Sequence, residues 1–568
     1  MNKFLLIFLS INLTFINILG QQKSELALRF PLDIPAVVTG SFGELRSNNF
    51  HAGIDFATNQ TIGLPVYAVD DGYISRIFVS HTGYGKAVYI NHPSGYTSVY
   101  GHFHEFSPDI EAFVTNLQYK RESFSIDYNL KSGEMPIKKG ELIGKSGNSG
   151  NSSGPHLHFE MRETASQKPL NVHFFNFPIK DNVPPHIEAI CIYPMDEFSA
   201  VNGRNEPLYI QTTGSDGHYQ LKNNPEITAS GNIGIGVEVT DYYPNSIRKC
   251  GVYSIVLIAD EQKIFESRLD CFLFDNQRYI NSHIDYERKI TSGISIQKSF
   301  LDYNNKLNIY KTNQQRGVVE IIPAQIHTFK YEITDPAKNV SYISFTVNGI
   351  EGNLQGTSIR PMRINATQPY STEIEGFKVD FQENSFYTDI PYKFSVEPNN
   401  GTGLGAHFHI LDETIPIHKN FEIKIPISNE LQNTKGLCGT KINKGRLVYV
   451  SSKISGNEMV LTPREGGIYT LSADSIAPVI RLLNVPQGRN YSNQKEIRIE
   501  IKDNFSGIKN YRCTINDKWQ LFEYDAKNNV LIGYFDKMKI QKGNKHELVV
   551  KVSDNVGNEG ILNVNIVY

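Results

Sequence analysis

Residues 154–162 read GPHLHFEMR, a short run in which polar and apolar side chains alternate. Alternation with a period of two is typical of a β-strand whose two faces meet different surroundings. We therefore expect the apolar side chains of this strand to fill a hydrophobic core. The opposite face would carry His156, His158, Glu160 and Arg162.

A second stretch, FHAGIDF at residues 50–56, has the same alternation and places His51 and Asp55 on one face. Two histidines and one carboxylate supply the three protein ligands of a catalytic zinc ion and leave a fourth position open for water. Spacing alone does not decide between His156 and His158, because they share a face. The two stretches together nevertheless predict a metal site.

The H-x-H spacing by itself is weak, because it also occurs at residues 102–104 and at residues 407–409. The latter pair lies among polar loop residues, with Asp412 and His418 nearby, and we interpret it as structural. Seven of the 16 histidines fall between residues 51 and 158. This concentration favours the N-terminal part of the chain as the place of the chemistry.

Several further motifs lie between the two histidine stretches. In chain order they are PVYA at 65–68, DG at 71–72, GYG at 83–85, YTSVYGH at 96–102, KGELIG at 139–144 and GNSGNSSG at 147–154. In this order they resemble the lysostaphin-type (LytM-like) zinc metallo-endopeptidase family over roughly residues 38–163. The resemblance implies a small antiparallel β-sheet zinc peptidase domain. It also implies that His51, Asp55 and His158 bind Zn²⁺, while His156 and His102 act on the water and on the developing oxyanion.

The resemblance further implies hydrolysis of peptide cross-links in bacterial peptidoglycan. Zinc lowers the pKa of bound water from about 15.7 to about 7 and polarises the scissile carbonyl. His156 is the candidate general base, and His102 would stabilise the oxyanion or protonate the leaving amine. Glu160 is interpreted as a positioning or solvated group. Two alternatives stay open: a non-catalytic cell-envelope binding or regulatory protein, and a protease acting on secreted proteins.

Two features depart from a minimal member of that family. His104 follows His102 closely and could compete for the metal. Residues 107–138 form an insertion that begins with a predicted helix, capped by Ser107 with Pro108 in its first turn. We expect this insertion to cover one end of the substrate groove, which would bear on specificity or self-inhibition.

Turn residues also predict two hairpins in the domain at residues 21–178. Residues 64–69 and 73–79 flank Asp-Asp-Gly, and residues 87–91 and 96–100 flank Pro-Ser-Gly.

Beyond residue 180 the sequence changes to period-two strands separated by Asn, Asp, Gly and Pro, which predicts several β-sandwich modules. A weak internal repeat supports two of them, since VPP at 183–185, VTD at 239–241 and DPAKN at 335–339 are echoed by IAP at 476–478, IKD at 501–503 and DNVGN at 554–558. We expect immunoglobulin-like modules at 181–350 and 476–568, around a β-rich segment of uncertain fold at 351–475.

Length, charge and the N-terminus bear on the number of domains, the kind of partner and the localisation. A chain of 568 residues calls for several domains. Its 56 basic and 59 acidic residues give a net charge of −3, which argues against a nucleic-acid partner. Residues 1–20 resemble a secretory signal peptide, with a retained anchor as the alternative and no later membrane span. We therefore expect an exported protein of the periplasm or cell surface, or a secreted one, with an envelope protein as a partner of the C-terminal β domains.

Cysteine spacing adds little. All five cysteines lie beyond residue 190 without a C-x-x-C pair, which excludes a cysteine zinc ribbon and leaves any disulfide pairing open.

Overall fold

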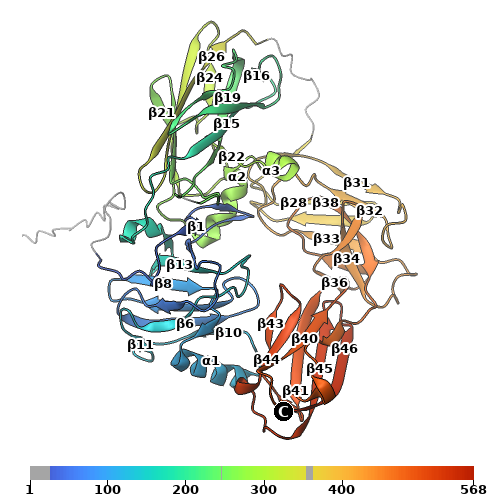
Figure 1. Ribbon diagram of the computed structural model, residues 1–568. Coiled ribbons are helices and arrows are strands. Elements are labelled where there is room, and N and C mark those ends of the chain that lie inside the picture. The colour runs from blue at the N-terminus through green and yellow to red at the C-terminus, as the bar shows by residue number, and fades with distance from the viewer. Residues whose placement is uncertain (1–25, 245, 353–361) are drawn as a thin grey trace, which may run out of the picture.

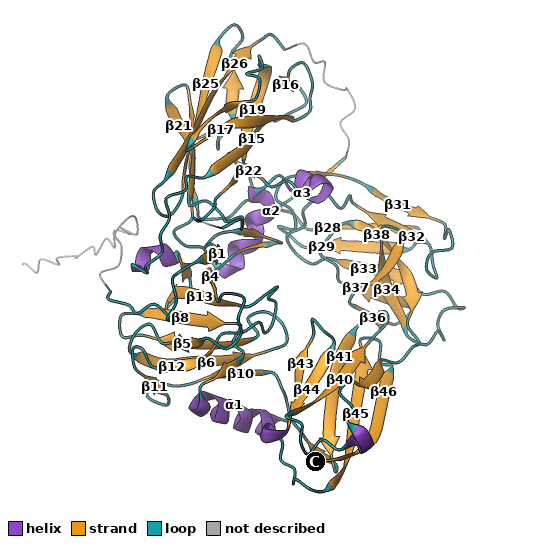
Figure 2. Ribbon diagram, viewed as in Figure 1, coloured by secondary structure: helices purple, strands orange, loops and turns teal. Residues whose placement is uncertain are grey.

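The computed structural model describes residues 26–244, 246–352 and 362–568. The expected signal peptide at residues 1–20 lies outside the described residues. The fold is mostly β, as predicted, with a β-rich N-terminal domain followed by further β-sheet modules (Figure 2). These parts follow one another in a circle, so that the last module returns to the N-terminal domain (Figure 1).

The N-terminal domain is built on a nine-stranded antiparallel sheet with a small three-stranded sheet beside it. The main path of the large sheet is β1 (Val38–Gly40), β4 (Ile54–Ala57), β13 (His156–Glu163), β8 (Tyr96–Gly101), β7 (Lys86–Asn91), β6 (Gly72–Val79) and β10 (Ile126–Asn129), with β11 (Pro136–Ile137) on β6 and β14 (Pro169–Leu170) on β13. The small sheet holds β5 (Pro65–Tyr67), β12 (Leu142–Lys145) and β9 (Glu105–Phe106).

The alternation of apolar and polar residues at 154–162 is confirmed in β13. Leu157, Phe159 and Met161 are fully buried in the hydrophobic core of the domain. The polar side chains of the strand lie on the other face, where β13 runs between β4 and β8. Since both neighbours are antiparallel to β13, residues from three distant segments meet at its centre.

One of the two predicted hairpins is confirmed and the other is wrong. Strands β7 and β8 pair directly across the Pro-Ser-Gly turn. Strand β5 does not pair with β6, because it belongs to the small sheet, where it pairs with β12. The segment between β5 and β6 is held by other partners: the backbone of Ala68 bonds to residues 140 and 141, and the amide of Val69 donates to the hydroxyl of Tyr100. The chain therefore changes sheets where a tight turn was expected.

Helix α1 (Pro108–Arg121) confirms the helix predicted at the start of the insertion. Ser107 is its N-cap residue and Pro108 occupies the first turn, where a missing amide hydrogen costs nothing. Ile110 and Val114 are buried against the sheet. The helix lies beside β10, at the far edge of the sheet from β4 (Figure 1).

The second part is a twelve-stranded sheet that closes on itself, because β19 pairs with both β15 and β26. Its longer strands are β15 (His186–Pro194), β17 (Leu208–Ser215), β19 (Thr228–Thr240), β20 (Ser254–Ala259), β21 (Gln262–Arg268), β25 (Ile326–Thr334) and β26 (Val340–Gly349). Between β21 and β26 lie the short helices η2 (Phe274–Tyr279), α2 (Ile280–His283) and α3 (Tyr286–Ser292).

The third and fourth parts are each two sheets around one core. The third has β28 (Tyr370–Ile374), β29 (Phe377–Phe381), β33 (Glu422–Pro426), β37 (Glu458–Leu461) and β36 (Ser452–Ser455) in one sheet, and β31 (Phe394–Glu397), β32 (His407–Ile410), β38 (Gly467–Ala473), β34 (Leu437–Asn443) and β35 (Arg446–Tyr449) in the other. The fourth has β39 (Val479–Leu482), β40 (Glu496–Lys502), β44 (Val530–Tyr534) and β43 (Glu523–Asp525) against β42 (Lys518–Trp519), β41 (Ile508–Ile515), β45 (Lys545–Asp554) and β46 (Glu559–Val567).

Neighbouring parts share side chains where they touch, so the residue limits of the four domains stay predictions. The core of the N-terminal domain includes Tyr243 and Leu521 from later parts of the chain. On α1, Tyr119 packs edge-to-face against Trp519 with ring centroids 5.1 Å apart, and Glu111 pairs with Lys537 at 2.6 Å. The helix of the insertion therefore packs against the last module.

All five cysteines are free in the structure. Over the described ranges, no helix combines the length and the apolar character that crossing a membrane requires.

Candidate metal centre

The centre lies where β4 meets β13. Asp55 on β4 and His158 on β13 are direct partners in the register of the two strands. His51 sits just before β4, where its backbone exchanges hydrogen bonds with the 43–44 turn. Close approach at this crossing depends on Gly53, because a Cβ there would stand 2.3 Å from the carbonyl oxygen of Phe159. The glycine in the H-x-G-x-D stretch is therefore required by packing.

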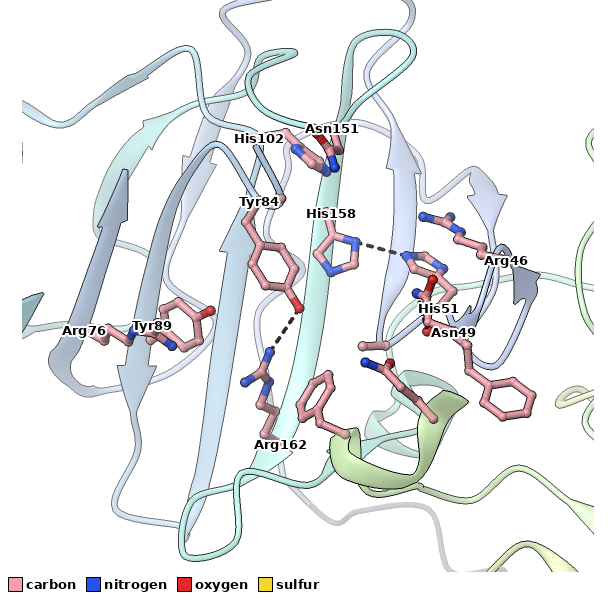
Figure 3. A pocket seen from close by; sticks show the side chains of 15 residues that line it. Arg46, Asn49, His51, Arg76, Tyr84, Tyr89, His102, Asn151, His158 and Arg162 are labelled. Atoms are coloured by element: carbon pink, nitrogen blue, oxygen red, sulfur yellow. Dashed lines mark hydrogen bonds between the residues drawn. The ribbon is translucent and has the colours of Figure 1, made fainter. Parts of the chain in front are cut away.

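Three ligand atoms converge at this point. Nε2 of His51 is 3.0 Å from Nδ1 of His158, and Oδ1 of Asp55 is 3.1 Å and 2.9 Å from these two nitrogens. Figure 3 shows the two imidazoles facing each other across the strands. All three side chains are less than a tenth exposed. The structure thus brings together the three residues to which the family resemblance gave the metal.

The remaining ring nitrogens identify which atoms are available to a metal. Nδ1 of His51 is 2.8 Å from the carbonyl oxygen of Ser41, and Nε2 of His158 is 2.8 Å from a carboxylate oxygen of Glu160. Because these oxygens can only accept, each of these nitrogens carries the hydrogen. In the neutral rings the two converging nitrogens present lone pairs, and with the Asp55 carboxylate they form a buried set of three acceptors.

Such a set fits a cation. Three acceptors within about 3 Å repel one another in a buried site unless a positive charge lies between them. Two imidazoles and one carboxylate match the preference of zinc for nitrogen and carboxylate ligands in tetrahedral geometry. The residues present therefore fit the metal that the family implies.

Outer partners fix the ligands in place. Oδ2 of Asp55 accepts a hydrogen bond from Arg46 at 2.7 Å. Burial raises the pKa of the Asp55 carboxyl, but the neighbouring His51, His156 and His158 imidazoles outweigh it and hold this pKa well below its usual value. The carboxylate is the ligand form, so these contacts prepare Asp55 to bind a cation.

Glu160 positions His158. Its carboxylate accepts from His158 at 2.8 Å, from the Tyr84 hydroxyl at 2.6 Å and from Nε of Arg162 at 2.6 Å. Burial works against the charged form, but Arg162 and His158 lower the pKa of Glu160 to about 2. The residue is fully buried and fully engaged, so it orients a ligand and is not placed to act as a base.

His156 and His102 stand beside the three ligands with their rings 4.8 Å apart. Nδ1 of His156 donates to the carbonyl of Gly154 at 2.9 Å, and Nδ1 of His102 donates to the carbonyl of Ser149 at 2.7 Å. The Nε2 atoms of both rings are therefore proton acceptors. Nε2 of His156 lies 3.4 Å from Oδ1 of Asp55, and its side chain is 16% exposed.

His102 owes its position to an unusual backbone. Strand β8 ends at Gly101, and His102 has a left-handed conformation with φ of 64°. This turn brings the imidazole under the 147–154 loop, where Ser149 accepts its hydrogen bond. Burial, and then His158 and His156, lower the pKa of His102 to about 3, so the ring is neutral at ordinary pH.

A cavity of about 430 Å³ opens next to the centre, and Figure 3 shows it from close by. His51, His158 and His102 form part of its wall, and Asn151 lines it from the 147–154 loop. Phe274, from η2 in the second part of the chain, closes one side. None of the residues lining this cavity comes from 107–138, whose helix packs on the last module. That the insertion covers one end of the substrate groove stays a prediction.

The other H-x-H histidines lie apart from the centre. His104 is exposed and faces the last module, near Lys86. Nε2 of His407 donates to the carbonyl oxygen of Thr402, and Nε2 of His409 lies 3.3 Å from a carboxylate oxygen of Glu397. His418 stacks on Tyr279. In the described part of the chain none of them joins a group of potential metal ligands.

Sequence reasoning missed Ser41 and Arg46, which hold His51 and Asp55. Neither was signalled, since a backbone carbonyl leaves no mark in the sequence and Arg46 lies outside both histidine stretches. Tyr84 was inside a quoted Gly-Tyr-Gly motif, which could have pointed to its contact with Glu160.

Comparison with known proteins matches residues 49–118 and 125–172 to peptidase family M23 and residues 361–474 to the Zu5-like domain. The DD-carboxypeptidase/endopeptidase Mpg of Neisseria meningitidis is 35% identical over 119 residues, covering 21% of this chain and 21% of Mpg. The peptidoglycan DD-endopeptidase ShyA of Vibrio cholerae is 27% identical over 195 residues, covering 33% of this chain and 39% of ShyA. An uncharacterized metalloprotease of Haemophilus influenzae is 30% identical over 147 residues, covering 25% of this chain and 26% of that protein.

Among solved structures, a zinc containing peptidase from Vibrio cholerae shares 28% identity over 25% of this chain and 37% of that chain, with a TM-score of 0.19. The catalytic domain of the antimicrobial peptidase lysostaphin from Staphylococcus simulans shares 25% identity over 22% of this chain and 80% of that chain, with a TM-score of 0.17. In the curated relatives above, the match spans well under half of their own length. The N-terminal domain of this chain belongs to peptidase family M23, the lysostaphin (LytM) type, and a Zu5-like domain follows it further along the chain.

Proposed function

We propose that the protein is an exported, zinc-dependent endopeptidase that hydrolyses peptide cross-links of bacterial peptidoglycan. The observation that carries the proposal is the convergence of His51, Asp55 and His158 beside two further imidazoles with free Nε2 atoms. Relatives named as peptidoglycan DD-endopeptidases support this choice of substrate. The intact ligand set favours catalysis over a purely regulatory role.

Zinc, when bound, lowers the pKa of a coordinated water and polarises the scissile carbonyl. His51, Asp55 and His158 would hold it. In each of these side chains the polar atom that faces away from the metal is fixed by a hydrogen bond. The Tyr84–Glu160–Arg162 contacts keep the His158 ring oriented, so that Nδ1 points to the centre. This arrangement leaves no reorganisation of the ligands for the reaction itself.

His156 acts as the proton acceptor in this proposal. Its Nε2 faces the centre and bears no hydrogen, because Nδ1 donates to Gly154. It takes a proton from the attacking water and returns it to the leaving amine. General acid–base catalysis of this kind contributes about 10²–10⁴-fold to a rate.

His102 lies across from His156 and is the more buried of the two. Neutral, with its hydrogen on Nδ1, it accepts a hydrogen bond from water and helps to orient it. If His102 in place of His156 takes the proton of the water at Nε2, that hydrogen can be donated to the tetrahedral oxyanion or passed to the leaving amine. The hydrogen bond to Ser149 fixes the ring for either task.

The experiment is digestion of purified peptidoglycan by the zinc-loaded protein, with separation of the fragments and mass spectrometry of the new ends. Hydrolysis of a peptide cross-link is expected for wild type and for His104→Ala, whose histidine is exposed and outside the centre. His158→Ala is expected to be inactive. Absence of new peptide ends in the wild-type digest contradicts the proposal.

Two other outcomes would identify the alternatives. Cleavage of secreted proteins without cleavage of peptidoglycan would indicate a protein-directed protease. A zinc content near zero in protein purified without chelator would indicate a non-catalytic envelope protein. Fractionation of the producing cells tests export to the periplasm, the cell surface or the medium. Affinity capture with the full chain as bait tests whether residues 181–568 bind an envelope protein.

A further inference from the structure

The internal repeat of the C-terminal part contains aspartates that the peptidase chemistry does not use. In the second part of the chain, Asp181, Asp241 and Asp335 bring one carboxylate oxygen each within 4.8 Å of the others. Asp181 lies on the segment that enters this part from the peptidase domain. Asp241 follows β19 and Asp335 follows β25, so three separate segments supply the group (Figure 2).

Asp241 is the residue that needs explanation. Its side chain is fully buried, and neither of its carboxylate oxygens has a hydrogen-bond partner. Oδ2 of Asp181 is also buried without a partner, and Asp335 beside them is fully buried. A buried unpaired carboxyl group is destabilising in either protonation state, since the ionised form lacks a counter-charge and the protonated form lacks an acceptor for its hydrogen.

The electrostatics agree with a missing positive charge. Burial, and then Asp335 and Asp181, raise the pKa of Asp241 to about 9. Burial also raises the pKa of Asp181 to about 7. Within the described residues no lysine or arginine forms an ion pair with this group, so the protein itself does not balance it.

The last module repeats the arrangement with Asp474, Asp503 and Asp554, whose carboxylate oxygens likewise lie within 4.8 Å of one another. Asp474 enters the module, as Asp181 does, and each of these two residues stands four positions before a proline. Asp503 follows β40 as Asp241 follows β19.

The third aspartate of each set ends a long strand in the same way. Asp335 and Asp554 each accept a hydrogen bond from the amide of an asparagine four residues later, Asn339 at 2.6 Å and Asn558 at 2.7 Å. In the second set, Oδ1 of Asp503 has no partner, nor has the hydroxyl of Ser506, which is 4% exposed and whose amide donates to Asp474.

We propose that each of these two aspartate sets binds one calcium ion. A donor set made of oxygen atoms alone favours a hard cation over zinc or copper. Calcium takes oxygen ligands at about 2.3–2.6 Å, and two oxygens on one such ion lie at most about 5 Å apart, as the carboxylates of each set do. The inference is independent of the proposed peptidase activity.

The position of the two sites gives them a structural role. Asp181 belongs to the segment between the peptidase domain and the second part, and Asp474 is the last residue of the Zu5-like match, where the chain enters the last module. Bound calcium ties each entering segment to the module that follows. It would thereby fix the orientation of the peptidase domain against the modules that surround it.

The test is equilibrium dialysis of the zinc-loaded full chain against radioactive CaCl₂. Two calcium ions per chain are expected, with dissociation constants of about 10⁻⁴–10⁻³ M, the range of extracellular calcium modules. Asp241→Asn and Asp503→Asn should each lower the stoichiometry from two to one, and the double variant should bind none. Asp216→Asn and Asp517→Asn, at exposed aspartates of the same two parts, should keep both ions.

Thermal unfolding adds a second readout. Calcium is expected to raise the unfolding temperature of wild type, and less so that of Asp241→Asn. In the absence of calcium, Asp241→Asn should unfold at a higher temperature than wild type at neutral pH, because it removes a carboxyl whose raised pKa forces it to take up a proton on folding.

No bound calcium at millimolar concentration overturns the proposal, as does calcium binding that both variants retain. A stoichiometry of one that Asp503→Asn leaves unchanged supports the first site and overturns the second. Equal binding of MgCl₂ overturns the assignment to calcium. His158→Ala should keep both calcium ions, so failure of the peptidase proposal remains distinguishable.

Discussion

Nε2 of His51 and Nδ1 of His158 lie 3.0 Å apart, although in the neutral rings both atoms present lone pairs. Each ring is locked in this orientation by a hydrogen bond on its other side, to Ser41 and to Glu160. Two acceptor atoms held this close together in a buried place are arranged to bind a cation. The predictions about the centre depend on this relationship.

A substitution at a ligand and one at the proposed base should separate metal binding from proton transfer. His158→Ala is expected to lose zinc, because two ligands remain of three. His156→Ala is expected to keep zinc and to lose activity by about 10²-fold or more, the usual size of a general acid–base contribution. Zinc content by elemental analysis and turnover of peptidoglycan check both. Full turnover in His156→Ala would disprove the role given to this residue.

Glu160→Gln should weaken the centre without removing a ligand. The variant loses the charge that binds the hydrogen of His158 Nε2 and leaves Arg162 unpaired. Loss of such an outer partner lowers metal affinity by about 10–100-fold. Competition with a chelator measures it, and Glu163→Gln, at the end of the same strand, is the control. Equal zinc affinity in both variants would count against the positioning role.

Gly53→Ala should destabilise the N-terminal domain. The added methyl group would lie 2.3 Å from the Phe159 carbonyl oxygen and 2.7 Å from Cγ of Glu160. Overpacking of this kind costs about 1–3 kcal/mol or more. Chemical denaturation should show the loss, whereas Gly154→Ala should change little, since nothing lies within 4 Å of its Cβ position.

The stability of the contact between the peptidase domain and the last module should decrease at acid pH. Burial raises the pKa of Glu523, but Lys86 and Lys537 outweigh it and lower that pKa from 4.5 to about 2. A lowered pKa in the folded state adds stability that is complete above pH 4.5 and is lost as the pH falls through about 2.

Glu523→Gln tests this dependence. The variant should be less stable than wild type at neutral pH, and the difference should shrink over that acid range. Asp536→Asn, at an exposed site of the same module, is the control. A difference that stays constant down to pH values of about 2 would show that the Glu523 ion pairs do not act across this contact.

Part of the fold could be read from local pattern. The alternation in residues 154–162 predicted which side chains of β13 enter the hydrophobic core, since successive residues of a strand point to opposite faces. It did not predict that the polar side chains His158, Glu160 and Arg162 are buried as well. The helix after Ser107 was predicted for a similar reason, from capping and the spacing of apolar residues. The hairpin expected around residues 70–72 was wrong, because turn residues do not reveal that β5 finds its partner in β12.

The sequence by itself determined that two histidine stretches share a chemistry and that the C-terminal part repeats a pattern of aspartates. The order of the surrounding motifs and the family resemblance carry the first of these, and the spacing within each repeat carries the second. Only the tertiary structure decided which nitrogen of each ring faces the centre, and that Asp241 is buried without a partner. These properties depend on groups from distant segments, such as the Ser41 carbonyl, whose positions follow from strand pairing and packing and leave no local trace in the chain.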